Sequence, residues 1–126
     1  MNNLLFPILS ILSDGRFHSG EAIAKQFNVS RVSVWQVLAE AEKLGVEIFS
    51  VRGKGYSLSH SVQFIDEVKV KQSIGEMSSW FNIKVFDVLD STNNFLMQEA
   101  PKGYPHASCV ATNIQTSGKG RRGRQW

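Results

Sequence analysis

The residues with the clearest chemical potential form a cationic, glycine-rich run near the end of the sequence. Lys119, Arg121, Arg122 and Arg124 are interspersed with glycines, and no acidic residue interrupts them. A glycine lets the backbone approach an anion without a Cβ in the way, and each arginine offers a planar fork of N–H donors. The run therefore predicts a flexible clamp for a phosphate or a carboxylate, and the alternative from composition alone is a disordered basic tail.

The glycine spacing in this run also fits the Gly-x-Gly-x-x-Gly pattern of dinucleotide-binding folds. In those folds the pattern opens a helix that holds the pyrophosphate and packs closely on a strand. The arginines make the segment too charged for that position. An oxidoreductase fragment is therefore the weakest alternative, and it requires an acidic ribose-binding residue about 20 positions further on.

A second candidate site lies in the first half of the sequence. Apolar residues at helical spacing predict three helices, near 4–12, 19–28 and 30–44, with Ser19 and Ser30 as N-caps of the second and third. After Gly45 the period changes to two, which predicts a hairpin with a basic tip at 52–55. Two helices joined by a short turn and followed by such a hairpin are the parts of a winged helix-turn-helix.

The third helix and the hairpin tip supply the candidate DNA contacts. A major groove admits one helix, whose N-terminal residues reach base edges, while serines and hairpin cations suit phosphates or the minor groove. Solvated polar positions or a protein-docking module are the alternatives. The predicted DNA-binding residues are Ser30, Arg31, Ser33, Gln36, Arg52 and Lys54.

Three expectations concern burial. The stripe of Val34, Leu38, Ala41 and Leu44 is predicted to face the core of the first domain. Trp35 is expected at the flank of that core, because large aromatic residues are mostly buried, and its alternative is a contact with a thymine methyl. The single cysteine, Cys109, is expected to be a buried small hydrophobe.

Charge, hydropathy and cysteine content restrict the classes of protein to which this sequence can belong. The net charge is +3, but residues 1–60 contain six basic and five acidic residues and are almost neutral, so specific DNA binding would depend on dimerisation. The apolar run near the N-terminus is too short to span a bilayer. We expect a cytoplasmic protein that has no membrane partner and no metal site formed by cysteines.

The remainder of the sequence predicts the start of a second domain. The polar cluster at 59–61 is the expected boundary, giving domains 1–60 and 61–126. An amphipathic segment at 65–74, a strand at 83–88, a helix at 92–99 and a buried strand at 107–114 follow. Unpaired strand edges in this half predict loose folding or pairing with another copy.

Two motifs resemble those of one known family. The run Gln115-Thr-Ser-Gly-Lys-Gly-Arg-Arg-Gly-Arg-Gln-Trp126 is similar to the glycine-arginine signature of biotin protein ligases, and Asp90-Ser91-Thr92-Asn93 resembles the motif that accompanies it. The segments 17–21 and 53–58 resemble the DNA-binding domain of the bifunctional members, which are of the BirA type and also act as biotin operon repressors. The resemblance covers essentially the whole chain, as the N-terminal portion of such a protein.

The resemblance implies an α+β chain in which the winged helix-turn-helix precedes the truncated start of a class II synthetase-like α/β catalytic domain. It implies a two-step reaction: biotin and ATP, with Mg²⁺ expected, give biotinyl-5′-AMP and pyrophosphate, and biotin then passes to a lysine of the biotin carboxyl carrier domain of acetyl-CoA carboxylase. Operator DNA is the other expected partner, and biotinyl-AMP is expected to favour a homodimer. No cofactor is expected to be permanently bound.

The resemblance also implies which residues hold the ligand. Ser91, Thr92 and Asn93 would line the biotin site with Gln115 beside them, and Trp126 would lie near the adenine. The loop that closes over biotin and the adenylate would consist of Gly118, Lys119, Gly120, Arg121, Arg122 and Gly123.

Two features depart from the family pattern. Lys119 stands where arginine is usual, so a bidentate contact becomes a point charge. The later Lys-Trp-Pro-Asn-Asp motif is not in this sequence, so no catalytic residue is assigned and the chain alone is expected to be inactive as a ligase. A stand-alone winged-helix transcription regulator with a small anion-sensing segment is the alternative function.

Overall fold

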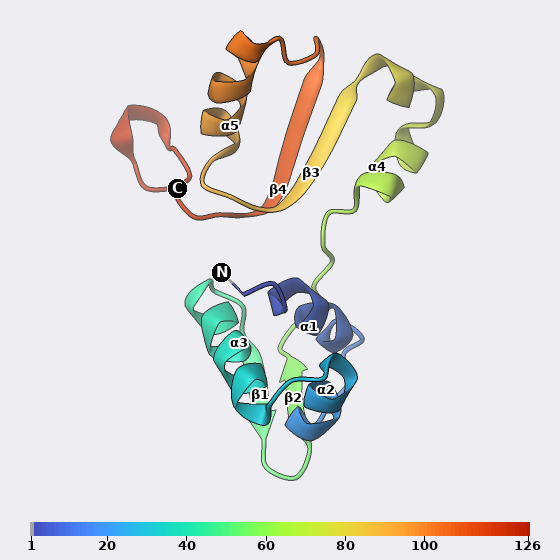
Figure 1. Cartoon of the computed structure of the whole chain (residues 1–126), viewed down its shortest axis with the longest axis vertical. Coiled ribbons are helices and arrows are strands. Elements are labelled where there is room, and N and C mark those ends of the chain that lie inside the picture. The colour runs from blue at the N-terminus through green and yellow to red at the C-terminus, as the bar shows by residue number, and fades with distance from the viewer. Residues whose placement is uncertain (1) are drawn as a thin grey trace. The chain divides into compact units, whose positions relative to one another are not determined.

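The computed structural model describes residues 2–126 as two compact units (Figure 1). The N-terminal unit extends to Gln63 and the C-terminal unit is Phe64–Trp126, so the division falls just beyond the polar cluster at 59–61. Both units combine helices with a small sheet, which makes the chain an α+β protein. Among the described residues, no helix has the length and apolar character needed to cross a membrane.

Three short helices form the body of the N-terminal unit. Ser19 Oγ accepts a hydrogen bond from the N–H of Ala22, and Ser30 Oγ accepts one from Ser33, so both predicted N-caps are confirmed. Asn28 ends the second helix in the left-handed conformation, with φ of 53°. The helices are α1 (Leu5–Leu12), α2 (Gly20–Phe27) and α3 (Arg31–Lys43).

The core of this unit lies where apolar faces of the three helices meet. Val34, Leu38 and Ala41 are buried, as the helical spacing predicts. Leu44 is not part of the core: it is 36% exposed, because α3 ends at Lys43 and the chain turns away at the C-cap. Val37, which is not in the predicted stripe, is fully buried.

A hairpin completes the unit as the wing. Strands β1 (Ile48–Val51) and β2 (Gly55–Leu58) pair antiparallel, with Val51 opposite Gly55. Tyr56 also exchanges two backbone hydrogen bonds of 2.8 Å with His18, which joins the wing to the segment before α2. Gly55 has a φ of +100°, and a Cβ there would lie 2.1 Å from the His18 carbonyl oxygen. Only glycine therefore permits this close approach.

The C-terminal unit is built around a β-α-β segment. Its two strands run parallel, and α5 makes the crossover that a parallel pair requires. Figure 1 shows α5 beside β4 and α4 beside β3, and these elements pack against each other. The elements are α4 (Glu67–Ile74), η1 (Gly75–Trp80), β3 (Asn82–Leu89), α5 (Thr92–Glu99), η2 (Ala100–Lys102), β4 (Ser108–Gln115) and η3 (Arg121–Gly123).

Burial in the C-terminal unit is shallow. Phe86, Phe95 and Tyr104 form an aromatic cluster with ring centroids 4.9 and 5.8 Å apart, and Ile83 is buried. The strand predicted to be buried, β4, is at most half-buried along its length. Cys109 is exposed, so its predicted burial is wrong. The reason is that β4 pairs with β3 alone among the described residues, which leaves part of the sheet uncovered.

Candidate nucleic-acid interface and ligand loop

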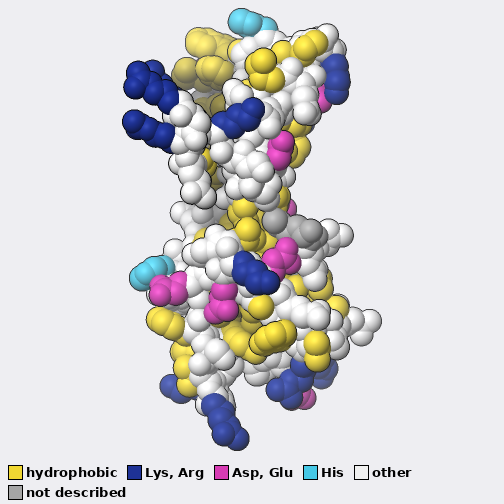
Figure 2. Space-filling view, turned by 90° about the vertical axis from the view of Figure 1, so that its left-hand side faces the viewer, with side chains coloured by type: hydrophobic (Ala, Val, Ile, Leu, Met, Phe, Trp, Pro, Cys, Tyr) yellow, Lys and Arg dark blue, Asp and Glu magenta, His cyan; other side chains and the backbone are white. Residues whose placement is uncertain are grey.

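A groove of about 750 Å³ lies between the wing and the N-terminal ends of α2 and α3. We call it the reader groove. In Figure 2, dark-blue Lys and Arg side chains project at the end of this unit where Figure 1 shows the wing. The lining residues are Ser19, Gly20, Glu21, Arg31, Val32, Trp35, Ser50, Val51, Arg52, Gly53, Gly55 and Tyr56.

The structure brings two of the predicted DNA contacts together in this groove. Arg31 from the first turn of α3 and Arg52 from the wing both line it, and both are exposed. Lys54, at the wing tip, is exposed and places its Nζ 5.8 Å from the centre of the Phe17 ring. Gln36 is exposed on α3 but does not line the groove.

The two predicted serines take part in the helix cap. Ser30 Oγ accepts the Ser33 N–H at 3.0 Å, and the two hydroxyl oxygens are 2.8 Å apart. The cap fixes the first turn of α3, the turn that carries Arg31. Both serines therefore position the start of the helix, whatever contacts their hydroxyl groups make with a ligand.

Two apolar residues of the groove are more exposed than their residue types predict. Trp35 is 60% exposed, so its predicted place at the flank of the core is wrong. The buried face of α3 is already filled by Val34, Val37 and Leu38, which leaves the indole on the groove side. Val32, to which no role was assigned, lies beside it and is 63% exposed.

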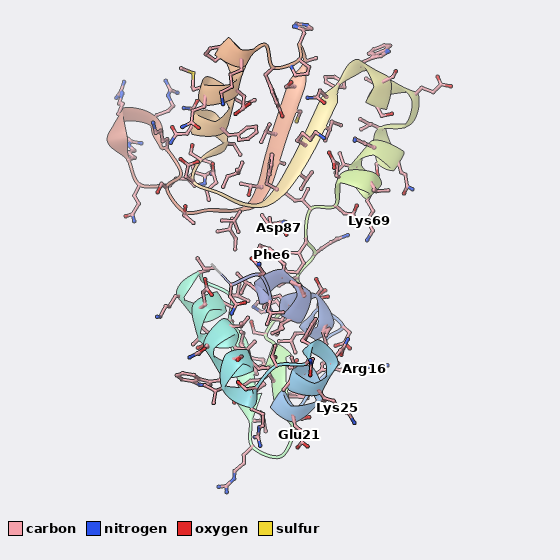
Figure 3. The ribbon with its side chains drawn as sticks, in the orientation of Figure 1. Phe6, Arg16, Glu21, Lys25, Lys69 and Asp87 are labelled. Atoms are coloured by element: carbon pink, nitrogen blue, oxygen red, sulfur yellow. The ribbon has the colours of Figure 1, made fainter. Side chains whose placement is uncertain are left out.

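One acidic residue lines the reader groove. Figure 3 shows Glu21 at the start of α2, at the wing end of the unit. Its position in the first turn of α2 is favourable for the helix dipole. It also places a negative charge in a groove that is lined by two cations, Arg31 and Arg52.

In the C-terminal unit, the predicted biotin-site residues are joined by hydrogen bonds. The Thr92 N–H and hydroxyl both donate to Gln115 Oε1, at 2.9 and 3.2 Å. Ser91 is only 1% exposed and caps α5, accepting from the Asn94 N–H at 3.4 Å. Asn93, between them on the first turn, is exposed. The start of α5 and the end of β4 thus meet, as the β-α-β connection requires.

Asp90 organises this junction, although the sequence analysis gave it no role. Its carboxylate accepts from the Ser91 N–H at 2.6 Å and from Asn94 Nδ2 at 3.1 Å, and its backbone oxygen accepts from the Ser117 N–H at 2.8 Å. The Asn94 and Ser91 hydrogen bonds and the nearby Lys119 charge hold the pKa of Asp90 below its usual value. The signal in the sequence is an Asx residue two positions before the predicted helix at 92–99, since such a side chain often accepts from backbone N–H groups that follow it.

The glycine-rich run folds back on itself. A Cβ at Gly118 would lie 2.6 Å from Trp126 Cδ1, and a Cβ at Gly120 would lie 2.4 Å from the Arg124 carbonyl oxygen. Lys119 forms an isolated antiparallel bridge with Gln125. Gly118 and Trp126, predicted to share a ligand site, are therefore in close proximity. The described residues contain no group of three or more His, Cys, Asp or Glu side chains that could hold a metal ion.

The exposed cations of the loop point to an anionic ligand. Arg121 and Arg122 are both exposed, and Arg122 adopts the left-handed conformation with φ of 58°. Gly123 follows with φ of 70°. Such a loop offers backbone N–H groups and guanidinium groups, and the run itself contains no acidic residue.

Comparison with known proteins shows what the chain is similar to. Residues 5–57 match the model of the HTH domain family. The chain is 35% identical to the bifunctional ligase/repressor BirA of Salmonella typhimurium over 119 residues, which is 94% of this chain and 36% of that protein. This chain is thus similar to part of the BirA ligase/repressors.

Further BirA proteins show the same relationship. The Escherichia coli BirA is 33% identical over 125 residues, 99% of this chain and 37% of that protein, and the Bacillus subtilis BirA is 31% identical over 110 residues, 87% and 34% respectively. The resemblance to bifunctional ligase/repressors is thus confirmed. The chain spans about a third of the length of these curated relatives.

The two comparisons cover different parts of the chain. The HTH model ends at residue 57 and covers the helices and most of the wing. The similarity to BirA proteins covers up to 125 residues, so it includes most of the C-terminal unit as well. Residues 5–57 are therefore covered by both comparisons, and the remainder of the chain is covered by the similarity to BirA proteins alone.

Proposed function

We propose that the N-terminal unit binds operator DNA and that the protein to which this chain belongs is a biotin-responsive repressor and biotin protein ligase. The observation that carries the DNA-binding part is the reader groove, where Arg31 and Arg52 converge from a helix-turn-helix and a wing. The name of the relatives, ligase/repressor, supports both activities.

The DNA-binding step would place α3 in the major groove. Arg31 would reach a guanine edge or a phosphate and Gln36 an adenine edge, while Arg52 and Lys54 would contact the backbone beside the helix. The N-terminal unit carries almost no net charge, so a single copy would bind weakly. Dimerisation doubles the phosphate contacts, and we propose that biotinyl-AMP controls it.

The ligase step would use the C-terminal unit. The biotin carboxylate would attack the α-phosphorus of ATP, pyrophosphate would leave, and a carrier lysine would then displace AMP from biotinyl-5′-AMP. Ser91 and Thr92 would satisfy the polar ureido head of biotin, and leaving such a head unpaired costs about 1–3 kcal/mol. Lys119 and Arg121 would offset the phosphoryl charge through electrostatics, without forming a covalent bond.

DNA binding is tested by selecting duplexes from a random pool with the full chain and measuring their affinity by fluorescence anisotropy. We expect sequence-selective capture, and Arg31→Ala should weaken binding and reduce the salt slope by about 1. Lys69→Ala, which removes an exposed lysine of α4, is the matched control and should leave affinity unchanged. Failure to enrich any sequence would overturn the DNA-binding proposal.

The ligase proposal is tested on the protein as the gene encodes it, with biotin, ATP, Mg²⁺ and a carrier domain. We expect biotinylated carrier, and we expect Thr92→Val to raise the KM for biotin because it removes one hydroxyl group near Gln115. Calorimetry with biotin and with inorganic phosphate separates the alternative. A stand-alone regulator with an anion-sensing segment would bind phosphate and would not bind biotin.

A further inference from the structure

Two apolar side chains project from the face of α3 that the DNA reader would present. Val32 is 63% exposed and Trp35 is 60% exposed. They are three positions apart on a helix and therefore lie on one face, one turn from each other. Exposed large apolar groups at the centre of a binding surface are expected to be covered by the partner.

The surroundings of this pair indicate which partner covers it. Arg31 and Arg52 line the same groove, and Val51 of the wing, 41% exposed, adds a third apolar group. The groove therefore combines three exposed apolar side chains with two cations, and Glu21 is the acidic residue in its lining. A duplex has the complementary pattern, with base edges in the middle of a groove and phosphates along its borders.

The chemistry of Val32 and Trp35 restricts what they would read in a duplex. A valine side chain has no hydrogen-bonding group, and an indole is neutral with a single N–H donor, so the exposed surface of both is mostly apolar. In the major groove the apolar group is the C5-methyl of a pyrimidine, which thymine carries and unmodified cytosine lacks. Gln36, one turn beyond Val32, is exposed and suited to the adenine edge of an A·T pair.

We propose that Val32 and Trp35 are specificity-determining residues that read a pyrimidine C5-methyl group in the operator. This inference rests on the proposed DNA binding and adds the base class that α3 selects. The same methyl group occurs on thymine and on 5-methylcytosine. We assign thymine as the natural target of the pair, because Gln36 beside it favours A·T.

The test uses the full chain and duplexes that it selects from a random pool. Each thymine of a tight-binding duplex is replaced singly by deoxyuridine, which removes only the methyl group. We expect the affinity to fall about 3- to 10-fold at one or two positions, consistent with about 0.8 kcal/mol per buried methylene-sized group and more with close packing. In a second arm, a 5-methylcytosine·guanine pair replaces the T·A pair at those positions. Recovery of affinity means that the methyl group alone is read. No recovery means that the whole T·A pair is read.

Variants connect the effect to the two residues. Trp35→Ala and Val32→Ala should bind thymine and uracil duplexes equally. Trp35→Phe should keep part of the discrimination. This conservative variant also tests whether the fold tolerates a change at the exposed position. Val68→Ala removes a valine of α4 that is 62% exposed, and it should keep the full discrimination. If every uracil substitution is neutral while selective binding persists, the methyl-reading proposal fails and DNA binding stands. If no duplex is selected, both fail.

Discussion

The two units of this chain differ in what lies beneath their candidate sites. Among the described residues of the N-terminal unit, eleven apolar side chains are buried, and α3, whose buried face contributes to that core, also supplies residues to the reader groove. In the C-terminal unit, Ile83 is the only hydrophobic residue with comparable burial among the described residues. There the site residues are held mainly by hydrogen bonds to one another, such as those between Thr92 and Gln115.

The geometry of the two sites therefore depends on different interactions, namely apolar burial in the N-terminal unit and hydrogen bonds in the C-terminal unit. The geometry of the reader groove follows from helices that bury their own apolar faces. The C-terminal unit leaves apolar groups exposed on several elements, including Val68, Trp80 and Met97. Its site is therefore expected to be less rigid in this chain than the reader groove.

The largest expected effect is on hydrogen exchange. We expect backbone amides of β3 and β4 to exchange at least about 100-fold faster than those of α1 and α3, because few buried contacts oppose local opening of the thin sheet. The measurement is hydrogen–deuterium exchange on a dilute monomer. Equal protection in both units would show that the C-terminal unit is as stable as the N-terminal one.

Replacing a buried isoleucine by alanine in each unit tests the same difference in packing. Ile8 is fully buried, so Ile8→Ala should lower the free energy of unfolding by about 2–5 kcal/mol. Ile83→Ala should cost less, because its surroundings are partly open. Urea denaturation followed by circular dichroism measures both, and Val68→Ala, at an exposed position, should change stability by less than about 0.5 kcal/mol. An equal loss for Ile8→Ala and Ile83→Ala would contradict the difference in packing.

The wing glycines give a matched pair within the N-terminal unit. Gly55→Ala should destabilise this unit by about 2–4 kcal/mol, since the new Cβ meets the His18 backbone and the positive φ is strained for alanine. Gly53→Ala has the φ strain alone, with nothing within 4 Å, and should cost about 1–2 kcal/mol. Thermal unfolding compares the two variants. A larger loss at Gly53 would mean that the contact between wing and His18 is not as described.

The smallest expected effect is a pH dependence of the C-terminal unit. The pKa of Asp90 is lowered from 3.8, chiefly by the Asn94 side chain and then by the Ser91 N–H. Asp90 therefore adds stability above its ordinary pKa, and this contribution is lost as the pH falls through the lowered pKa. We expect protonation of Asp90 at low pH to weaken the start of α5, and an acid titration followed by NMR measures this. Asp90→Asn should remove the pH dependence. A titration at or above the ordinary value would contradict these hydrogen bonds.

Much of the N-terminal unit could be predicted because its determinants are local. Caps at Ser19 and Ser30 and the stripe of α3 follow from side chains a few positions apart. The bridge between His18 and Tyr56 joins residues far apart in sequence, and no local pattern indicates it. Trp35 was misplaced because the tendency of tryptophan to be buried outweighed its helical position, 100° from Val34.

In the C-terminal unit, the elements could be predicted but their burial could not. Periodicity gave the helix at 92–99 and both strands, since each element carries its own pattern. An apolar strand such as β4 indicates a tendency to be covered, but not whether a second layer covers it, and Cys109 is exposed for that reason. The contact of Thr92 with Gln115 depends on the parallel register, which sequence spacing does not specify.

The two hydrogen bonds between His18 and Tyr56 have a mechanical consequence. They brace the wing against the helix pair before any partner arrives, so association would lose little conformational entropy in the hairpin. A wing that is held in place before binding does not change its conformation to fit the DNA. It would reject duplexes whose groove width differs from its own span, so DNA shape would contribute to its choice of sequence.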